Sequence, residues 1–475
     1  MKNFTDFNIN TRIKRNLQAV FSNESFIIKY YFCNMTKILV IGAGRSATSL
    51  IDYLLKNANE FNWYITVADV DKKLAEEKIA GQLNARAVSF NISDTEKRRA
   101  LIQQHDFVIS MLPAFLHGDV ARDCVEFGKH MATASYVSAD MKALDKEAKS
   151  KNILLLNECG LDPGIDHASA MKVMDGIKDK GGEITSFKSY CGGLVAPESN
   201  DNPWGYKFSW NPRNVILAGQ GTAQYLENGE LKFIPYNRLF TQTDEIEIEG
   251  PGKFDAYANR DSIGYIDVYG LGAVKTMLRG TLRQHGYCKA WNVFVKLGLT
   301  DDTVKISGAN KLTYADLINS FLPNGKASVK EKLKTFMANQ YDAEIENMLD
   351  YLELFSGKKI GINEGTPAQI LQALLEEKWK LKAHDKDMIV MQHQFEYSLP
   401  SQTNTQKLNS SLVVIGKDEH HTAMALTVGL PLAITVKNFL TKQFNLCGIQ
   451  IPVKKEMYEP LLKELEEHNV VFKES

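Results

Sequence analysis

Short apolar runs alternate with segments of helical periodicity from residue 35 to about residue 157. The apolar runs predict strands, because four to six consecutive apolar residues suit a strand that is buried on both faces. The segments between them carry apolar residues three and four positions apart, which predicts helices. The predicted strands cover residues 37–41, 64–68, 85–90, 107–111, 130–134 and 153–156. One predicted helix opens with the capping-box pattern Ser93-Asp94-Thr95-Glu96, and another extends from His117 to Phe127 and ends before Gly128.

This alternation is typical of an α/β fold with a doubly wound parallel sheet of the Rossmann type. Ligands of such sheets bind beyond the carboxyl ends of the strands. We therefore expect a site where five segments meet, namely Gly42 to Ala47, Asp69, Leu112-Pro113, Ser135-Tyr136 and Glu158 to Gly164.

The pattern changes after Gly164. A helix from His167 to Lys178 leads into strand-like runs, and the cluster Ser189-Tyr190-Cys191-Gly192-Gly193 is expected to end the first of these strands. Further segments are predicted as strands at 245–248, 388–395 and 411–415, and as helices at 312–321, 329–337, 343–355, 367–379, 422–440 and 456–467. The predicted domains are a leader at 1–34 that is disordered or extraneous, a dinucleotide-binding domain at 35–160, a second α/β domain for substrate at 161–308 and 381–415, and a helical insertion at 309–380, with the segment from about 416 to 475 packing back on the first domain.

A dinucleotide-binding pattern follows the first strand. It consists of Gly42-Ala43-Gly44-Arg45-Ser46-Ala47, a helix and a second strand that ends in Asp69. Gly42 allows the tight turn, Gly44 lets the backbone approach a pyrophosphate, and Ala47 lets the helix lie close to the sheet. The pyrophosphate would meet the free N–H groups at the start of the helix. A lone glycine turn is weak evidence, but this complete arrangement predicts nucleotide binding.

Asp69 bears on the identity of the cofactor. A carboxylate after the second strand accepts hydrogen bonds from the ribose of NAD and would repel the additional phosphate of NADP. Lys72 and Lys73 follow closely, but they are also what the solvated first turn of a helix would carry. The cofactor is therefore expected to be NAD(H) or NADP(H), with NAD slightly favoured.

The candidate catalytic and substrate-binding residues are acids, a thiol and several arginines. Residues 157–167 place three acids and His167 at the end of the sixth strand, which is more than an Asp-Pro-Gly turn requires. Cys191 taken alone would be a buried core thiol. Arg213, Arg260, Arg279 and Arg283 stand beside Gly, Asn or Thr in predicted loops. For each arginine a surface ion pair is an alternative, but as a set they suggest a substrate with several carboxylates.

Composition limits the partners. A chain of 475 residues should hold two or three domains, and its net charge of −1 argues against nucleic acid. Six scattered cysteines without a Cys-x-x-Cys pair suit reduced thiols in the cytoplasm, and no metal site is predicted. The uncharged stretch at 422–436 is short for a membrane span and contains Pro431, which predicts a buried helix and no membrane.

Several blocks closely resemble the L-glutamate-forming saccharopine dehydrogenases, also called saccharopine reductases. The blocks are residues 135–138, 157–167, 189–194, 201–210, 259–262, 279–283, 387–393 and 423–429, so the resemblance extends from Met35 to the C-terminus. It implies a nucleotide-binding domain, a substrate and dimerisation domain, a small helical domain and a homodimer. It also implies the reversible reaction of saccharopine, NAD(P)+ and water to give 2-aminoadipate 6-semialdehyde, L-glutamate and NAD(P)H in lysine metabolism.

The resemblance also implies roles for individual residues. Tyr136 and Val137 would line the substrate site, Asp162 would contact both ligands, and Cys191 would lie between cofactor and substrate. The resemblance adds Asp162, Cys191, Asn211, Pro212, Arg213 and Asn214 to the cofactor residues that the glycine pattern and the strand ends predict, namely Gly42, Gly44, Arg45, Ser46, Ala47, Asp69, Leu112 and Pro113. Saccharopine carboxylates would be bound by Arg260, Thr281, Leu282 and Arg283. Two positions depart from the family: Asp69-Val70-Asp71 stands where NADP-dependent members have a basic residue, and Ala114 where a Tyr is frequent.

In this reaction the secondary amine must lose its proton before a hydride leaves the neighbouring carbon, and the imine must then add water and split. We expect Asp162 with Tyr136, and Cys191 beside them, to form the catalytic group, with a raised pKa at Asp162. His117 and His167 are weaker candidates.

Two alternatives stay open. A related imine-reducing dehydrogenase of polyamine synthesis would need acids where Arg260 and Arg283 stand. A non-catalytic nucleotide-sensing protein would bind NADH without oxidising it.

Overall fold

The structure is a computed structural model that describes residues 35–400 and 402–475. The predicted leader at 1–34, with Cys33, lies outside the described residues. The other five cysteines are free thiols.

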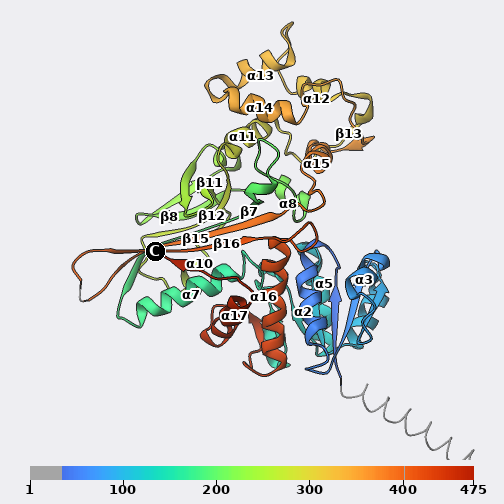
Figure 1. The fold of residues 1–475 in the computed structure, drawn as a ribbon, viewed down its shortest axis with the longest axis vertical. Coiled ribbons are helices and arrows are strands. Elements are labelled where there is room, and N and C mark those ends of the chain that lie inside the picture. The colour runs from blue at the N-terminus through green and yellow to red at the C-terminus, as the bar shows by residue number, and fades with distance from the viewer. Residues whose placement is uncertain (1–34, 401) are drawn as a thin grey trace, which may run out of the picture.

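The first sheet contains seven parallel strands in the order β17-β6-β5-β4-β1-β2-β3 (Figure 1). The strands are β1 (Thr36–Ile41), β2 (Trp63–Asp69), β3 (Ala85–Ser89), β4 (Phe107–Ser110), β5 (His130–Ala132), β6 (Leu154–Leu156) and β17 (Gly448–Gln450). The chain runs outward from β1 to β3 on one side and from β4 to β6 on the other. The crevice at this reversal, between β1 and β4, is where a doubly wound sheet binds its ligand.

Helices cover both faces of this sheet. Ile38 and Val40 of β1 belong to one hydrophobic cluster, and Leu39 and Ile41 belong to another on the opposite face. The helices are α2 (Thr48–Asn57), α3 (Lys72–Ile79) and α16 (Ala423–Leu440) on the first face, and α4 (Thr95–Gln103), α5 (His117–Phe127) and α6 (Ala139–Ser150) on the second. The predicted doubly wound fold is confirmed. The predicted capping box at Ser93 was wrong. Asp94 caps α4, and its carboxylate accepts the Lys97 N–H at 3.2 Å. Asp caps a helix as well as Ser does, and Asp94 stands one residue nearer to the helix.

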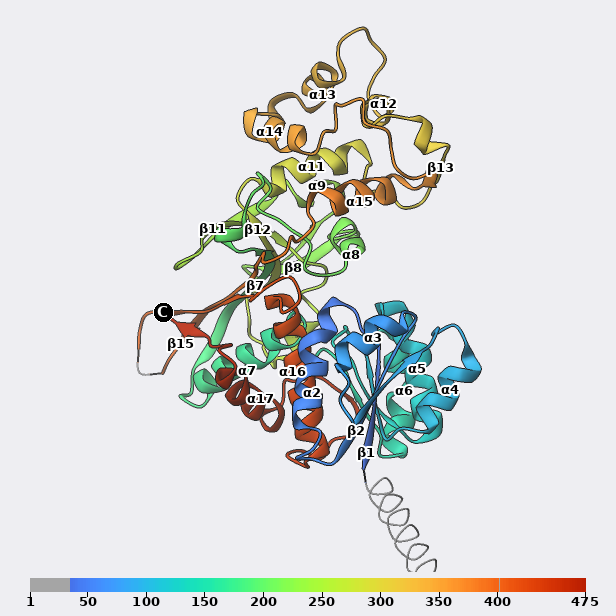
Figure 2. The same cartoon turned by 45° about the vertical axis from the view of Figure 1, so that its right-hand side comes forward.

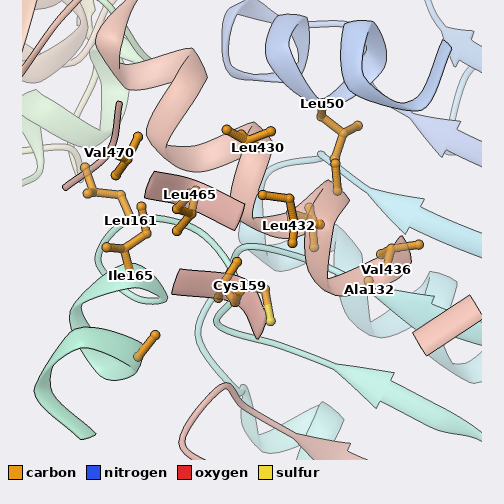
Figure 3. Packing of buried hydrophobic residues seen from close by; sticks show 14 of the residues in the cluster. Leu50, Ala132, Cys159, Leu161, Ile165, Leu430, Leu432, Val436, Leu465 and Val470 are labelled. Atoms are coloured by element: carbon orange, nitrogen blue, oxygen red, sulfur yellow. The ribbon is translucent and has the colours of Figure 1, made fainter. Parts of the chain in front are cut away.

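The C-terminal segment returns to the first domain. Strand β17 pairs with β6, and α16 packs beside α2. Figure 3 shows Leu430 and Leu432 of α16 in the same cluster as Leu50 of α2 and Cys159. Helix α16 is long and apolar enough to cross a membrane, but 72% of it is buried within the fold. The prediction of a buried core helix is confirmed.

A second, mixed sheet forms the other large layer. Its main path is β10 (Thr243–Ile248), β11 (Gly252–Ala258), β12 (Thr276–Gln284), β7 (Glu183–Val195), β15 (Asp387–Ser398), β16 (Gln406–Ile415) and β18 (Lys473–Glu474), with β8 (Ala223–Glu227) and β9 (Glu230–Ile234) joined through β12. Only the β7–β12 pair of this path is parallel. Because β7 continues to Val195, Cys191 lies within the strand and not at its end, contrary to the prediction.

The remaining helices pack on this sheet. Helices α7 (Ile165–Lys178) and α17 (Lys455–Glu467) lie together on the side of the first domain. The helical insertion lies at the opposite end of the molecule, as both views show (Figures 1 and 2). Its helices are α12 (Tyr314–Ser320), α13 (Val329–Met337), α14 (Ala343–Tyr351) and α15 (Pro367–Lys378), which join α11 (Tyr287–Leu297) around a core that includes Trp204, Trp291 and Trp379. The short helices are α8 (Pro212–Ile216), α9 (Tyr236–Leu239) and α10 (Tyr265–Val268), and β13 (Ile306–Ser307) pairs with β14 (Glu364–Gly365).

Candidate active site

A cavity of about 1070 Å³ lies between the carboxyl ends of the first sheet and the second sheet. This volume suits a ligand pocket that must hold more than one small molecule. The lining from the first domain comprises residues 44–47, 110–114, 133–138 and 160–163, and the lining from the second includes residues 191–193, 210–212, 257, 259–260, 281 and 283. The main cavity therefore opens at the edge of the sheet where the sequence predicts the site.

The glycine turn is shaped for a close backbone approach. Gly42 has φ +103°, and a Cβ there would lie 2.9 Å from the Met111 carbonyl oxygen, so only glycine fits this turn. A Cβ on Gly44 would meet nothing within 4 Å, which leaves the backbone open toward the main cavity. The chain then makes a short 3-10 turn at Arg45–Ala47 that leads into α2. These residues fit a pyrophosphate at the start of a helix.

Asp69 fastens this turn. Its Oδ2 accepts the Ala43 N–H at 2.7 Å, and its Oδ1 accepts the Asp71 N–H at 3.0 Å. Asp71 in turn caps α3, and the exposed Lys72 and Lys73 pair with acids one turn along that helix. Gly42 and Asp69 thus shape the turn from behind, and neither lines the main cavity.

Asp162 is held at the border of the two domains. Its Oδ1 accepts a hydrogen bond from the Tyr136 hydroxyl at 2.9 Å and from Arg279 Nη2 at 2.5 Å. The same Nη2 donates to Asp166 Oδ2 at 2.7 Å, and Asp166 Oδ1 accepts the Gly164 N–H at 2.6 Å. One guanidinium nitrogen therefore serves two carboxylates, of which only Asp162 lines the main cavity.

The two carboxylates differ in pKa. Burial opposes the charge of both. At Asp166 the opposing effects of His167, Arg279 and the Gly164 amide prevail, and its pKa lies below the ordinary value. At Asp162 burial, with repulsion from Asp166, prevails over Arg279 and raises the pKa. A carboxylate with a raised pKa is a stronger proton acceptor when it is ionised, which suits Asp162 to general-base catalysis.

Tyr136 and Cys191 stay protonated beside it. Burial raises the pKa of the Tyr136 phenol well above its usual range, so Tyr136 donates its proton to Asp162 as a hydrogen bond and keeps it. Burial and the nearby Asp162 also raise the pKa of the Cys191 thiol. A neutral thiol is a weak nucleophile, so Cys191 can contact ligands but is not activated for covalent chemistry.

Arg283 is a buried cation without a protein anion. Arg283 is only 4% exposed, and its Nε has no hydrogen-bond partner among the described residues. Nη1 donates to the Leu282 carbonyl at 3.2 Å and Nη2 to the Tyr257 hydroxyl at 3.4 Å. No carboxylate of residues 35–400 or 402–475 pairs with it, although it lines the main cavity. A buried guanidinium in this state is ready to receive a ligand carboxylate.

Arg260 supplies a second cation. It is exposed, follows β11 in a loop, and adopts φ +43°, a conformation that non-glycine residues rarely take. Its guanidinium lies 5.9 Å from the centre of the Tyr136 ring. Among the residues that the structure describes it has no ion-pair partner, and it lines the main cavity.

Most of the predicted site residues line one cavity. They are Gly44, Arg45, Ser46, Ala47, Leu112, Pro113, Tyr136, Val137, Asp162, Cys191, Asn211, Pro212, Asn214, Arg260, Thr281 and Arg283. Arg213 and Leu282 do not line it. Arg213 forms an ion pair with Asp302, and Leu282 is fully buried in the core of the second sheet.

The arginines were wrongly placed in loops, except Arg260. Arg279 and Arg283 belong to strand β12, and Arg213 belongs to α8. Arg279 also pairs with protein carboxylates and is not free for substrate. The sequence shows each arginine's immediate neighbours, but an ion pair to a residue over 100 positions away depends on the fold.

The two histidines named as weaker candidates do not line the main cavity, and protein groups engage both ring nitrogens of each. His117 lies between Ser110 Oγ and Ser135 Oγ at 2.8 Å each, and burial lowers its pKa to about 4. His167 lies behind the site, with Nε2 2.8 Å from Glu158 and Nδ1 2.6 Å from the Tyr269 hydroxyl.

Several residues that line the main cavity were missed, among them Trp210, Tyr257, Asn259 and Lys380. Tyr257 lies opposite Thr281 in the β11–β12 register, so strand pairing would have revealed it. We find no sequence signal that would have revealed Lys380.

A doubly wound nucleotide-binding domain that faces a second α/β domain across a polar cavity defines the class of two-domain dinucleotide-binding proteins. Residues 38–156 match the saccharopine dehydrogenase NADP binding domain, and residues 160–471 match the saccharopine dehydrogenase C-terminal domain. The chain belongs to the saccharopine dehydrogenase family, as its sequence motifs predict.

Named relatives agree with this assignment. Saccharopine dehydrogenase (NADP(+), L-glutamate-forming) of Pyricularia oryzae is 33% identical over 90% of this chain and 96% of its own length. The structure of apo histidine-tagged saccharopine dehydrogenase (L-Glu forming) from Saccharomyces cerevisiae has a TM-score of 0.83 and 32% identity, and covers 93% of this chain and 99% of that one. Mitochondrial alpha-aminoadipic semialdehyde synthase of Mus musculus is 35% identical over 92% of this chain but 47% of its own length, so this chain spans about half of that relative.

Proposed function

We propose that this protein interconverts saccharopine, NAD(P)+ and water with 2-aminoadipate 6-semialdehyde, L-glutamate and NAD(P)H. The proposal is supported by the names of the fungal relatives, which align along nearly their whole length. Homodimeric assembly and a cytoplasmic location stay predictions.

The observation that carries the proposal is the state of Arg283. A buried guanidinium whose Nε is unpaired, and which no carboxylate of the described residues contacts, is costly unless a ligand anion joins it. Saccharopine has three carboxylates, and Arg260 offers a second cation at the same cavity. A diamine substrate would be repelled by both residues, which disfavours the polyamine alternative.

The residues at the border of the domains suit the proton steps. In the oxidative direction Asp162 takes the N–H proton of the secondary amine while the neighbouring C–H bond breaks and a C=N bond forms. The bound nicotinamide would accept the hydride. Water then adds to the carbon of the C=N bond, and Asp162 gives its proton to nitrogen and takes one from the water. Asp162 passes this second proton to nitrogen and takes the proton of the new hydroxyl group as the C–N bond breaks, which gives the aldehyde and the amino group of glutamate. Tyr136 and Arg279 hold Asp162 in place through their hydrogen bonds.

The cofactor is a nicotinamide dinucleotide, and the comparisons favour NADP. The first domain matches an NADP binding domain, and the fungal relatives are named for NADP(+). The slight preference for NAD expected from Asp69 is not supported by these comparisons. Both Asp69 oxygens already accept backbone N–H groups, so the residue has a structural task that does not depend on a ribose.

The test is the oxidation of NADPH and of NADH with 2-aminoadipate semialdehyde plus glutamate, followed by absorbance and by mass spectrometry for saccharopine. We expect saccharopine only when both substrates are present. Oxidation of reduced cofactor when a diamine replaces glutamate would favour the polyamine alternative. Tight binding of reduced cofactor without turnover in any mixture would favour the nucleotide sensor and end the proposal.

A further inference from the structure

A second cavity of about 590 Å³ adjoins the main one. It lies between the first domain, where α6 and the segment after β17 form one wall, and α10 of the second domain. Four residues line both cavities: Tyr136, Val137, Asn259 and Arg260. The two spaces are thus separated by side chains and not by a layer of the fold.

The dividing side chains belong to the proposed reaction centre. Tyr136 donates to Asp162, which lines the main cavity, and Arg279, which lines the second cavity, donates to the same carboxylate at 2.5 Å. Arg260 stands over the Tyr136 ring, exposed and without an ion-pair partner among the described residues. A movement of Arg260 alone would therefore widen the passage without disturbing the Asp162 hydrogen bonds.

The residues expected to bind the dinucleotide line the main cavity and not the second cavity. The glycine turn and residues 112–114 line the main cavity and do not reach the second cavity. A nucleotide on those residues would occupy the main cavity and leave the second cavity free. The glycine turn, where the pyrophosphate is expected, does not line the second cavity.

The charges around the second cavity suit an acidic amino acid. Lys142 on α6 is exposed and has no ion-pair partner in the described part of the chain, whereas Lys149 is bonded to Asp145 at 2.6 Å. With Arg260 it offers free cations for carboxylates, and Asp261 offers an anion for an ammonium group. Val268 and Ile449 add apolar lining, and Glu158 and Arg279 of the proposed reaction centre line the inner side.

We propose that the second cavity is the route by which the amino-acid ligands, glutamate above all, enter and leave while the dinucleotide occupies the main cavity. This inference rests on the proposed function. Lys142 attracts the acidic ligand, Arg260 transfers it past Tyr136, and Arg283 receives a carboxylate inside.

The first test removes the charge at the entrance. Lys142→Gln should raise the KM for glutamate about threefold at low salt, and the difference should vanish at about 0.5 M salt, where exposed charges are screened. Lys146→Gln, an exposed lysine of the same helix that does not line the cavity, is the matched control and should not change KM. The KM for the cofactor should be the same in all three proteins. An unchanged glutamate KM in Lys142→Gln would overturn the inference.

The second test narrows the passage. Val268→Trp, at the end of α10, should lower kcat/KM for glutamate about tenfold and leave the KM for the cofactor unchanged, because only one ligand passes that point. Val304→Trp, at an exposed valine 70% accessible and remote from the cavity, controls for a surface tryptophan. Equal losses for glutamate and cofactor, or no loss, would overturn the inference.

The two proposals fail separately. If the wild-type protein shows no turnover, the proposed reaction fails, and glutamate binding to the NADP-saturated protein is measured by calorimetry in the same variants. Weaker binding in Lys142→Gln than in Lys146→Gln would then support the route, and equal binding would overturn it.

Discussion

Arg283→Met should damage substrate binding strongly and the fold very little. In the proposed complex the guanidinium and a substrate carboxylate form a buried charge pair. Truncating one partner of such a pair costs about 2–5 kcal/mol, which corresponds to a rise of about 30-fold to several thousand-fold in the KM for saccharopine.

The effect on stability has two opposing parts. Replacing a buried ionised group with a hydrophobic residue of similar size is neutral or stabilising by about 1–4 kcal/mol. Against this, the tyrosine rings of residues 206, 257 and 287, at 5.5, 5.9 and 5.5 Å from the guanidinium carbon, would each lose about 0.5–1 kcal/mol of cation–π energy. At the middle of both ranges the two parts nearly cancel, so the free energy of unfolding should change little, and by no more than about 3 kcal/mol at the extremes.

The assay combines steady-state kinetics in both directions with urea unfolding. Arg238→Met, at an exposed arginine outside the cavity, is the control and should alter neither measurement. A saccharopine KM within twofold of wild type would refute the role of Arg283. A loss of several kcal/mol of stability with a normal KM would mean that the guanidinium serves the tyrosine stack alone.

Three further predictions follow from the site. Asp162→Asn should lower kcat by about 10²- to 10⁴-fold. In the wild-type protein, activity should fall on the acid side of the pH profile as Asp162, whose pKa is raised, becomes protonated, and this fall should be absent from the residual activity of the variant. If the variant keeps the fall, another group causes it. Asp69→Asn removes a negative charge near the expected position of the 2′-phosphate of NADP. At ~7 Å and an effective dielectric constant of ~20–40 the repulsion is about 1–2 kcal/mol, so the ratio of kcat/KM for NADPH to kcat/KM for NADH should rise roughly tenfold. A constant ratio would show that Asp69 only stabilises the turn. His117 has a pKa lowered to about 4, so its contribution to stability is complete above the unfolded-state pKa of ~6.5 and is lost as the pH falls, by about 2 kcal/mol at pH ~5. His117→Gln should flatten this part of the curve of unfolding free energy against pH, and an equally steep curve would disprove the assignment.

The first domain was predictable because its signals are local. The helix predicted from His117 to Phe127 has the same bounds as α5. Its end was predictable because Gly128, which adopts φ +70°, is a residue that commonly ends helices. Each apolar run became a strand of the parallel sheet, because strands covered on both faces have no need of polar positions.

The second domain was harder because its strands depend on neighbours. The glycines after Cys191 suggested the end of a strand, but β7 continues to Val195. A Cβ on Gly192 would lie 2.6 Å from the Leu282 carbonyl oxygen, so glycine is needed there for close packing and not for a turn. Such a contact between residues distant in sequence leaves no trace in a local pattern.

The same limit explains why Arg279 was misjudged, and its true position clarifies how the site works. Arg279 neutralises one charge where Glu158, Asp162 and Asp166 come together, so the inner end of the site keeps an excess of acid. Arg283 and Arg260 line the same cavity, and neither pairs with a carboxylate of the residues that the structure describes. A molecule with an amine at its centre and carboxylates at its ends would be oriented by this division, because the amine is drawn to Asp162 and the carboxylates to the guanidinium groups. Had Arg279 been free for substrate, Asp162 would keep only the hydrogen bond from Tyr136, and Asp166 only the one from the Gly164 amide. The amine would then face two carboxylates whose mutual repulsion Arg279 no longer offsets.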